Sequence, residues 1–299
     1  MDIDDYQATA ADTVQFNQEN ENEVISICLL GLSGEVGELA TEYKKKIRDG
    51  ESYQSFREKI IEEMGDIMWY LSSIATHEDI EFSEVLRKNE LKIRQRWHDL
   101  NHAGQLKFES EFYDDGCEDN EQFPREFVAE FREVVRKDGK LYAEISINGK
   151  PFGAPLRDNA YSDDFYRFHD LFHLSYVVVL GWSPIARRFL DCKRKNDDQK
   201  DEIEDGGRSA VIDEAISALV FDYASTHNFF DGTSGVDYEL LRTIKSLTKH
   251  LEIKNRTHKE WETAILLGYE IWRELKEKRK GRVICNMHEK TMMFEDMVE

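Results

Sequence analysis

Apolar side chains recur at helical spacing in three segments of the N-terminal third. The first stripe runs from Leu32 to Ile47 and ends at Asp49-Gly50, and the second runs from Phe56 to Ile74. A third follows Ser83, a residue type that favours the N-cap position, and we expect it to bury Leu86, Ile93, Trp97 and Leu100. A further helix is expected over residues 5–16. Four helices with short connections predict a four-helix bundle.

Beyond residue 100 the helical spacing lapses, and hairpin signals follow an acidic run. Residues 101–124 include Asp114-Asp115-Gly116 and a second acidic stretch, which together are typical of a linker. Asp138-Gly139 and Asn148-Gly149 then separate β-prone runs at residues 134–135, 141–147 and 152. Because Asp-Gly and Asn-Gly favour tight hairpin turns, the sequence predicts a small β-meander here.

Helical patterns return after the meander. One helix is expected from Ser162 to Gly181, and a second opens at Ser183-Pro184, a cap followed by proline in the first turn. Two long helices are expected over residues 209–229 and 257–280, with Gly281 closing the latter. The charged segment 193–207 is expected to be an exposed loop, and the tail from residue 286 to be mobile.

Length and charge narrow the class of protein. A chain of 299 residues is long enough for two domains at roughly 150 residues each. We predict a mainly α fold with a four-helix bundle at residues 1–104, an acidic linker at 105–125, and a mostly helical domain at 126–299 opened by the β-meander. The formal net charge of −21 argues against nucleic-acid partners and against docking on anionic lipid, because both need a basic face.

Targeting signals are not evident in the sequence. The start, from Met1 to Asp5, has neither the basic nor the apolar region of a secretory signal. The apolar stretch near residues 174–182 is far short of the roughly 20 residues that a membrane span requires. The cysteines form no CxxC pair and are expected to be reduced. The sequence therefore predicts a cytoplasmic protein without a membrane partner.

Two pairs of acidic residues are the strongest candidates for chemistry. Glu35 and Glu38 lie three residues apart in the first stripe, as do Glu63 and Asp66 in the second, so each pair shares one helix face. Packing the two stripes together would bring the pairs face to face. Four carboxylates in a partly desolvated cleft need a compensating charge. Mg²⁺, which prefers oxygen ligands and joins carboxylates to phosphates, is the simplest candidate.

Glycines and a basic helix add to this interpretation. Gly31, Gly34 and Gly37 lie within a helical pattern, where each costs about 1 kcal/mol relative to alanine. Close approach of a neighbouring helix or of a phosphate would explain that cost. On the third helix, one face carries the side chains of Asn89, Lys92 and Arg96, which could hold an anion such as triphosphate.

These motifs and their order resemble the MazG-like all-α nucleoside triphosphate pyrophosphohydrolases. The match comprises ExxE at residues 35–38, ExxD at 63–66 and Asn-x-x-Lys-x-x-x-Arg at 89–96, and it covers roughly residues 5–100. The resemblance implies hydrolysis of a nucleoside triphosphate to the monophosphate and pyrophosphate, by a homodimer or higher oligomer.

The same resemblance implies roles for individual residues. Mg²⁺, with Mn²⁺ as a possible substitute, would be held by Glu35, Glu38, Glu63 and Asp66. Nucleotide or phosphate would be held by Asn89, Lys92 and Arg96. The alternative interpretation of both sets is a solvated helix face.

The second half contains His169-Asp170-Leu171-Phe172-His173. Histidines four residues apart on a helix can share a metal, and Glu214 could be a third ligand. The pattern departs from zincins, because Asp stands where they have Glu, and from HD phosphohydrolases, which need a separate upstream His and a downstream Asp. The alternative is a pair of histidines satisfied within a helical core.

Three functional hypotheses follow. The leading one is a Mg²⁺-dependent pyrophosphohydrolase of a (deoxy)nucleoside triphosphate, with the C-terminal domain modulating specificity or assembly. The second is a sensor or adaptor that binds nucleotide without turnover. The third is a two-site enzyme with a second metal centre at His169 and His173.

Overall fold

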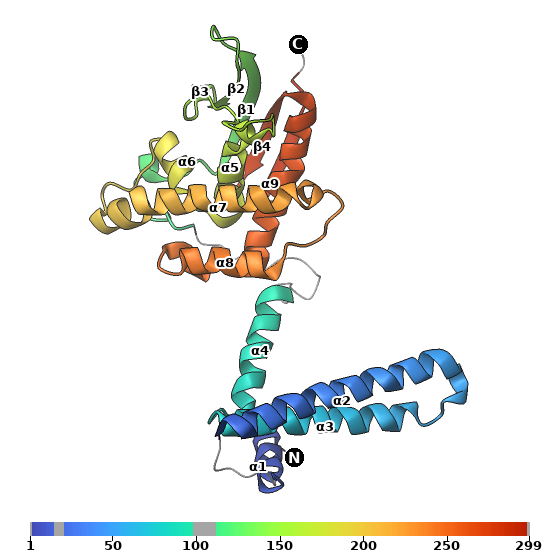
Figure 1. Cartoon of the computed structure of the whole chain (residues 1–299). Helices are drawn as coiled ribbons and strands as arrows, with labels where there is room; N and C mark the ends of the chain where they lie inside the picture. Colours follow the sequence, from blue (N-terminus) through green and yellow to red (C-terminus); the bar gives the residue numbers. More distant parts are fainter. Residues whose placement is uncertain (1, 15–20, 98–111, 298–299) are drawn as a thin grey trace. The chain divides into compact units, whose positions relative to one another are not determined.

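The computed structural model describes residues 2–14, 21–97 and 112–297. The chain divides into two compact units, Met1–Arg94 (unit 1) and Gln95–Glu299 (unit 2), and each is described by itself. The described residues form nine α-helices and one five-stranded antiparallel sheet (Figure 1). The predicted fold class, mainly α, is confirmed.

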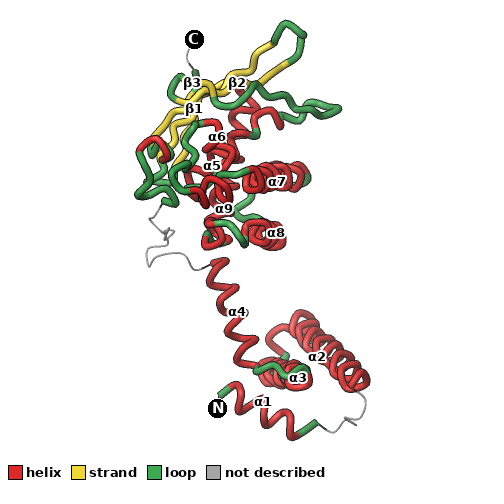
Figure 2. Tube along the Cα trace, turned by 90° about the vertical axis from the view of Figure 1, so that its left-hand side faces the viewer, coloured by secondary structure: helices red, strands yellow, loops and turns green. Residues whose placement is uncertain are grey.

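Unit 1 is built on a long antiparallel helix hairpin. Its helices are α1 Ile3–Asp12, α2 Glu21–Asp49, α3 Phe56–His77 and, as far as Arg94, α4 Phe82–Trp97. α2 and α3 run side by side and are joined through a 3₁₀ turn at Gly50–Ser52, where Gly50 has a left-handed φ of 59° (Figures 1 and 2). α1 packs against α3. The stripes expected over residues 32–47 and 56–74 thus both lie on this hairpin.

The start and the packing of α4 differ from the prediction. The helix begins at Phe82, and the backbone N–H of Ser83 donates to Oδ1 of Asp4 on α1, so Ser83 is not its N-cap. Leu86 and Ile93 are 45% and 44% exposed, so their expected burial is wrong: this face of α4 is not covered within unit 1. The side chain of Trp97, and Leu100 altogether, lie outside the described residues.

α2 carries an apolar stripe that unit 1 leaves exposed. Leu29, Val36 and Tyr43 follow one another at intervals of seven residues, so they share a helix face, and each is half exposed. Ile47 on the same face is 83% exposed. By length and composition alone, Glu23–Ser52 could cross a membrane, which the sequence reasoning did not anticipate. Contiguous exposed apolar surface is typical of interaction sites.

Unit 2 contains the sheet, in the order β3-β2-β1-β4-β5. Its strands are β1 Glu126–Val135, β2 Leu141–Ile147, β3 Lys150–Pro151, β4 Lys280–Asn286 and β5 Thr291–Glu295. The first three confirm the predicted meander, and Gly139 and Gly149 take the left-handed φ values of 73° and 78° that its turns require. The mobile tail expected from residue 286 is wrong, because β5 pairs with β4.

The helices of unit 2 surround one fully buried helix. They are α5 Asp170–Leu180, α6 Pro184–Phe189, α7 Gly207–Ser225, α8 Tyr238–Thr248 and α9 His258–Lys278. Every residue of α5 is buried, since α9 and α7 pack against it and β5 also contacts it (Figure 2). The α5 helix begins at Asp170, after a 3₁₀ turn at Tyr166–Phe168, and not at Ser162 as expected.

The caps of α6 and α9 follow the sequence in part. Ser183 caps α6, as predicted, by accepting from the backbone N–H of Ala186 at 3.0 Å. The N-cap of α9 is Thr257, which forms a capping box with Glu260. Gly281 does not close α9, because Arg279 takes the left-handed conformation at the cap and Gly281 already lies in β4.

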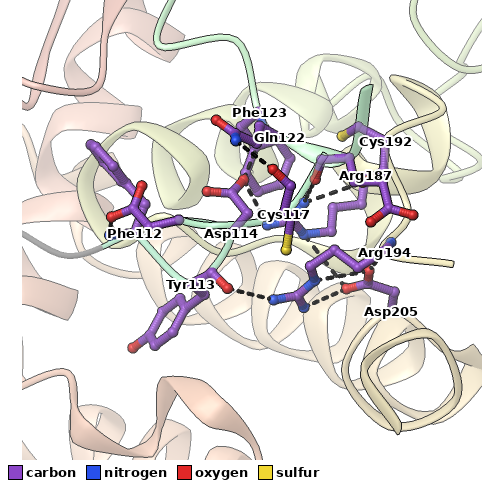
Figure 3. A network of polar contacts seen from close by, with 12 residues as sticks. Phe112, Tyr113, Asp114, Cys117, Gln122, Phe123, Arg187, Cys192, Arg194 and Asp205 are labelled. Carbon is purple, nitrogen blue, oxygen red and sulfur yellow. Dashed lines mark hydrogen bonds and ion pairs between the residues drawn. The ribbon is translucent and has the colours of Figure 1, made fainter. Parts of the chain in front are cut away.

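A buried ion-pair network corrects two further expectations (Figure 3). Oδ1 of Asp114 accepts from Arg125 at 2.7 Å, and its Oδ2 accepts from Arg187 at 3.0 Å. Arg194 donates to both oxygens of Asp205, at 2.7 and 3.1 Å. Residues 112–125 are therefore packed structure and not an acidic linker, and the segment 193–207 is not simply an exposed loop, because paired charges can be buried where unpaired ones cannot. Residues 105–111 of the expected linker lie outside the described residues.

Candidate functional site

The helix hairpin of unit 1 brings three of the four predicted carboxylates into one cluster. α2 contributes Glu35, and α3 contributes Glu63 and Asp66 from adjacent positions on one face. One carboxylate oxygen of each lies within 4.8 Å of the others, close enough to share a metal ion. The packing of α2 against α3 thus brings together three of the four carboxylates that the spacing singled out, and Glu38 is not in this cluster.

Glu38 acts on this cluster through its charge. Burial raises the pKa of Glu63, and the neighbouring charges of Glu38, Glu35 and Asp66 raise it further. Burial also raises the pKa of Glu35, with added repulsion from Asp66 and Glu38. Glu63 is buried, Glu35 is half-buried, and the other two are exposed. We call these four residues the carboxylate quartet.

The helical glycines of α2 have two different environments. A Cβ at Gly31 would lie 2.2 Å from the Tyr70 ring, so close approach of α3 explains this glycine. A Cβ at Gly34 or Gly37 would meet no atom within 4 Å of the described chain. Contact with a neighbouring helix thus explains Gly31 only. At Gly34 and Gly37 the surface of α2 is open to a ligand or a partner.

The predicted phosphate-binding residues lie on α4. Asn89 and Lys92 are exposed on that helix. The side chain of Arg96 lies outside the described residues. Their role in holding nucleotide or phosphate stays a prediction.

A second cluster lies in unit 2, where α5 meets α7. His169, Asp170 and His173 occupy the first turn of α5 and its N-cap, and each offers one ligand atom within 4.8 Å of the others. Glu214 on α7 faces the two imidazoles: its Oε2 is 3.7 Å from Nε2 of His169 and 3.5 Å from Nε2 of His173. The three residues named from the sequence are thus neighbours.

Hydrogen bonds fix the orientation of both imidazoles. Nδ1 of His169 lies 2.9 Å from the carbonyl oxygen of Tyr166, and Nδ1 of His173 lies 2.8 Å from Oδ1 of Asp213. Since both partners are acceptors, each Nδ1 carries the proton, and both Nε2 atoms are left to face Glu214. Oδ2 of Asp213 accepts from Ser183 at 2.6 Å, which holds the carboxylate in place.

Burial shifts the titration of this cluster. Burial lowers the pKa of His169 to about 4, helped by the charge of His173, and raises the pKa of Asp170 to about 7. Burial disfavours the charged form of His173, but the Asp213 carboxylate outweighs it and raises the pKa of His173. Sequence reasoning missed Asp170 and Asp213 as members of the cluster. Their adjacency to His169 and Glu214 in the sequence was the available signal.

A helix hairpin with converging carboxylates has the donor set of a divalent-cation site, a kind of centre that acts on phosphate groups. Comparison with known families agrees with this class. Residues 25–100 match the MazG nucleotide pyrophosphohydrolase domain, and residues 108–298 match the MazG C-terminal domain. The chain belongs to the MazG family. It is therefore an enzyme, a nucleotide pyrophosphohydrolase that acts on the phosphoanhydrides of nucleoside triphosphates.

A phage protein shares part of this similarity. The Gene 37 protein of Mycobacterium phage L5 is 36% identical over 101 residues, which cover 32% of this chain and 89% of the phage protein. No solved structure matches the chain significantly.

Proposed function

We propose that the carboxylate quartet holds Mg²⁺, with Mn²⁺ as a substitute, and that the enzyme converts a (deoxy)nucleoside triphosphate to its monophosphate and pyrophosphate. The observation that carries this proposal is the convergence of Glu35, Glu63 and Asp66 within 4.8 Å. Nucleotide pyrophosphohydrolase activity already follows from the family, so the proposal concerns the metal, its ligands and the products.

The donor set fits a hard divalent cation. All four side chains offer oxygen only. Burial raises the pKa values of Glu63 and Glu35, and repulsion from the neighbouring carboxylates raises them further, so a bound cation would offset this repulsion. Mg²⁺ held by these carboxylates would supply Lewis-acid chemistry at the phosphate groups. The quartet positions the cation, and the open side of α2 beside Gly34 and Gly37 leaves room for phosphate.

The remaining predicted roles belong to the same proposal. Asn89, Lys92 and Arg96 are proposed to bind nucleotide or phosphate, since cations attract an anion that bridges to a metal site. The exposed apolar stripe of α2 is proposed to pack on a second copy of the chain, and unit 2 to modulate specificity or assembly. The four cysteines are free, which fits the reducing cytoplasm expected from the sequence.

Product identification with a nucleotide panel tests the proposal. The purified full-length chain is incubated with Mg²⁺ and each (deoxy)nucleoside triphosphate, and the products are separated. We expect monophosphate and pyrophosphate as products, and we expect pyrophosphate release to stop when the metal is chelated. Diphosphate and phosphate as products would refute the proposed reaction. Nucleotide binding without any product would favour the sensor or adaptor hypothesis.

Variants of the quartet test its residues. Glu38→Gln and Glu63→Gln should each lower kcat/KM by more than about 100-fold, because even the outer partners of metal ligands cost 10–100-fold when removed. Glu58→Gln, which changes an exposed carboxylate in the first turn of α3, is the matched control and should retain activity. Activity unchanged in Glu38→Gln would remove Glu38 from the site.

A further inference from the structure

We propose that unit 2 holds a second metal centre, which binds one divalent transition-metal ion through four side chains: His169, Asp170, His173 and Glu214. The centre is separate from the carboxylate quartet, because all its ligands come from α5, its N-cap and α7. Its ligand is the ion itself, of the Zn²⁺ class.

The spacing of the ligand atoms fits one small ion. Ligands about 2.1 Å from a tetrahedral metal lie about 3.4 Å from one another. Glu214 Oε2 is 3.5 and 3.7 Å from the two imidazole Nε2 atoms, and Asp170 Oδ1 is 3.6 Å from Nε2 of His169. These three separations are too long for hydrogen bonds of good geometry and are close to three of the six edges of such a tetrahedron. In addition, one ligand atom each of His169, Asp170 and His173 lies within 4.8 Å of the others.

Two buried polar atoms in the cluster have no hydrogen-bond partner among the residues that the structure describes. Nε2 of His173 and Oδ2 of Asp170 are buried and unsatisfied, and His173 is 0% exposed. Leaving such atoms unpaired is costly in a protein interior, so unsatisfied polar atoms at this depth require an explanation. A metal ion held by the Asp170 carboxylate and by Nε2 of His173 would give that buried nitrogen the partner it lacks.

The surrounding hydrogen bonds have the form found behind metal ligands. Metal-bound histidines donate their other ring N–H to a carboxylate or a backbone carbonyl. His173 does so to Asp213, and His169 does so to the carbonyl of Tyr166. Asp213 is fixed in turn by the hydroxyl of Ser183 and the backbone N–H of Ile185, at 2.6 and 3.2 Å. We therefore assign Asp213 as a positioning residue.

The donor set selects the class of metal. Two imidazole nitrogens with two carboxylates suit Zn²⁺, Mn²⁺ or Fe²⁺, whereas Mg²⁺ prefers oxygen donors alone. The carboxylate quartet has only oxygen donors. The side chain of Glu214 is 43% exposed while the other three ligands are buried, so an ion can reach the cluster from the Glu214 side.

Metal analysis of the full-length chain tests this assignment. The protein is purified without chelator and its metal content is measured by mass spectrometry. It is then stripped and titrated with Co²⁺, which absorbs visibly at tetrahedral nitrogen and oxygen sites, and with Zn²⁺ against a coloured chelator. We expect one transition-metal ion per chain, visible Co²⁺ bands, and displacement of Co²⁺ by Zn²⁺ but not by excess Mg²⁺.

Variants assign the ion to the cluster. Glu214→Gln should weaken Zn²⁺ binding at least about 10-fold, and Asp213→Asn about 10–100-fold, because an amide facing Nδ1 of His173 favours the tautomer that protonates Nε2. Asp222→Asn, which changes an exposed carboxylate on the same helix, is the matched control and should bind normally. Circular dichroism checks that each variant folds. If Asp213→Asn does not fold, Glu214→Gln, at a half-exposed position, still tests whether the ion binds at this cluster.

The outcome is independent of the proposed pyrophosphohydrolase chemistry. Glu38→Gln should lose pyrophosphate release yet keep its transition-metal ion. A chain that releases pyrophosphate but takes up no Zn²⁺ or Co²⁺ would overturn the second centre and leave the first standing. Uptake that is equal in wild type, Glu214→Gln and Asp213→Asn would place the ion elsewhere and also overturn the proposal.

Discussion

Glu63 is a buried carboxylate surrounded by carboxylates. Its partners in the quartet raise its pKa in addition to burial, so the folded chain holds the ionised form at a cost. Interior positions normally avoid such repulsion, and natural proteins tolerate it mainly where function requires it. Repulsion at one residue is thus a physical sign of a cation site.

Glu63→Gln should stabilise the metal-free protein. A group whose pKa is raised on folding contributes its full stability below its unfolded pKa and loses that contribution as the pH rises through the folded pKa. At pH 7 the charged form of Glu63 is therefore unfavourable, and the neutral amide relieves it. Melting in the presence of a chelator should occur a few degrees higher in the variant, whereas the rise in Tm on adding Mg²⁺ should shrink. Glu58→Gln should change neither, and a lower Tm for Glu63→Gln in chelator would contradict the argument.

Alanine at the helical glycines should separate packing from ligand access. Gly31→Ala places a methyl group against Tyr70 and should destabilise by about 1–2 kcal/mol, because the ring must move. Gly34→Ala meets no atom of the described chain and should stabilise by about 0.5–1 kcal/mol through helix propensity. Urea unfolding measures both. Equal effects would show that Tyr70 does not constrain α2.

At the scale of elements, local signals were sufficient for some predictions. The α2–α3 hairpin and the β1–β2–β3 meander follow from helical periodicity and from Asp-Gly and Asn-Gly turns, which act over a few residues. β4 and β5 were missed. β4 lies near the end of unit 2 in the sequence but pairs with β1, which lies near its start. Such pairing depends on contacts between residues far apart in the chain, which no local pattern reports.

In the two candidate sites, too, local spacing predicted some features, whereas others depend on contacts between distant residues. The quartet residues were named because their spacing places each pair on one helix face, and the hairpin brings Glu35, Glu63 and Asp66 together. The contact between Asp213 and His173 was not predicted, because it depends on where α7 lies against α5. The acidic composition of residues 112–125 predicted a linker, but Asp114 is paired with Arg125 and with Arg187, which lies far away in the sequence.

Asp114→Asn should strongly destabilise unit 2. Burial acts to raise the pKa of Asp114, but hydrogen bonding from Arg125 and the charge of Arg187 outweigh it and lower the pKa. The ion pairs therefore stabilise the fold above the unfolded pKa, and this contribution is lost as the pH falls through the folded pKa. Removing the charge takes from the buried Arg187 its carboxylate partner at 3.0 Å and leaves it the more distant Asp205, at 3.5 Å, which costs about 3 kcal/mol.

Urea unfolding between pH 7 and pH 3 measures this loss. The difference between wild type and Asp114→Asn should shrink towards the acid end. Asp115→Asn is the matched control, since its exposed carboxylate contacts the same Arg125 at 3.1 Å and should cost less than about 1 kcal/mol. Equal costs for the two variants would show that the buried network does not stabilise unit 2.

At the scale of the whole molecule, the exposed stripe on α2 bears on assembly. Leu29, Val36, Tyr43 and Ile47 form a continuous apolar face on the helix that also carries Glu35 and Glu38. A second copy packed on this face would complete a helical bundle that one chain leaves open, and would close the surroundings of the quartet against water. Assembly and catalysis are then linked through α2.

Ile47→Glu should therefore weaken the proposed oligomer and lower activity together. A charge in an apolar interface must be desolvated without a partner, which costs several kcal/mol and shifts the equilibrium to monomer. Light scattering after size-exclusion chromatography measures the mass, and pyrophosphate release is assayed over a range of protein concentrations. Activity of the variant should recover as concentration rises, because mass action restores the dimer. Val211→Glu, at a similarly exposed apolar position in unit 2, should leave the mass unchanged. A wild-type chain that is a fully active monomer would show that one copy of the hairpin is sufficient for the reaction.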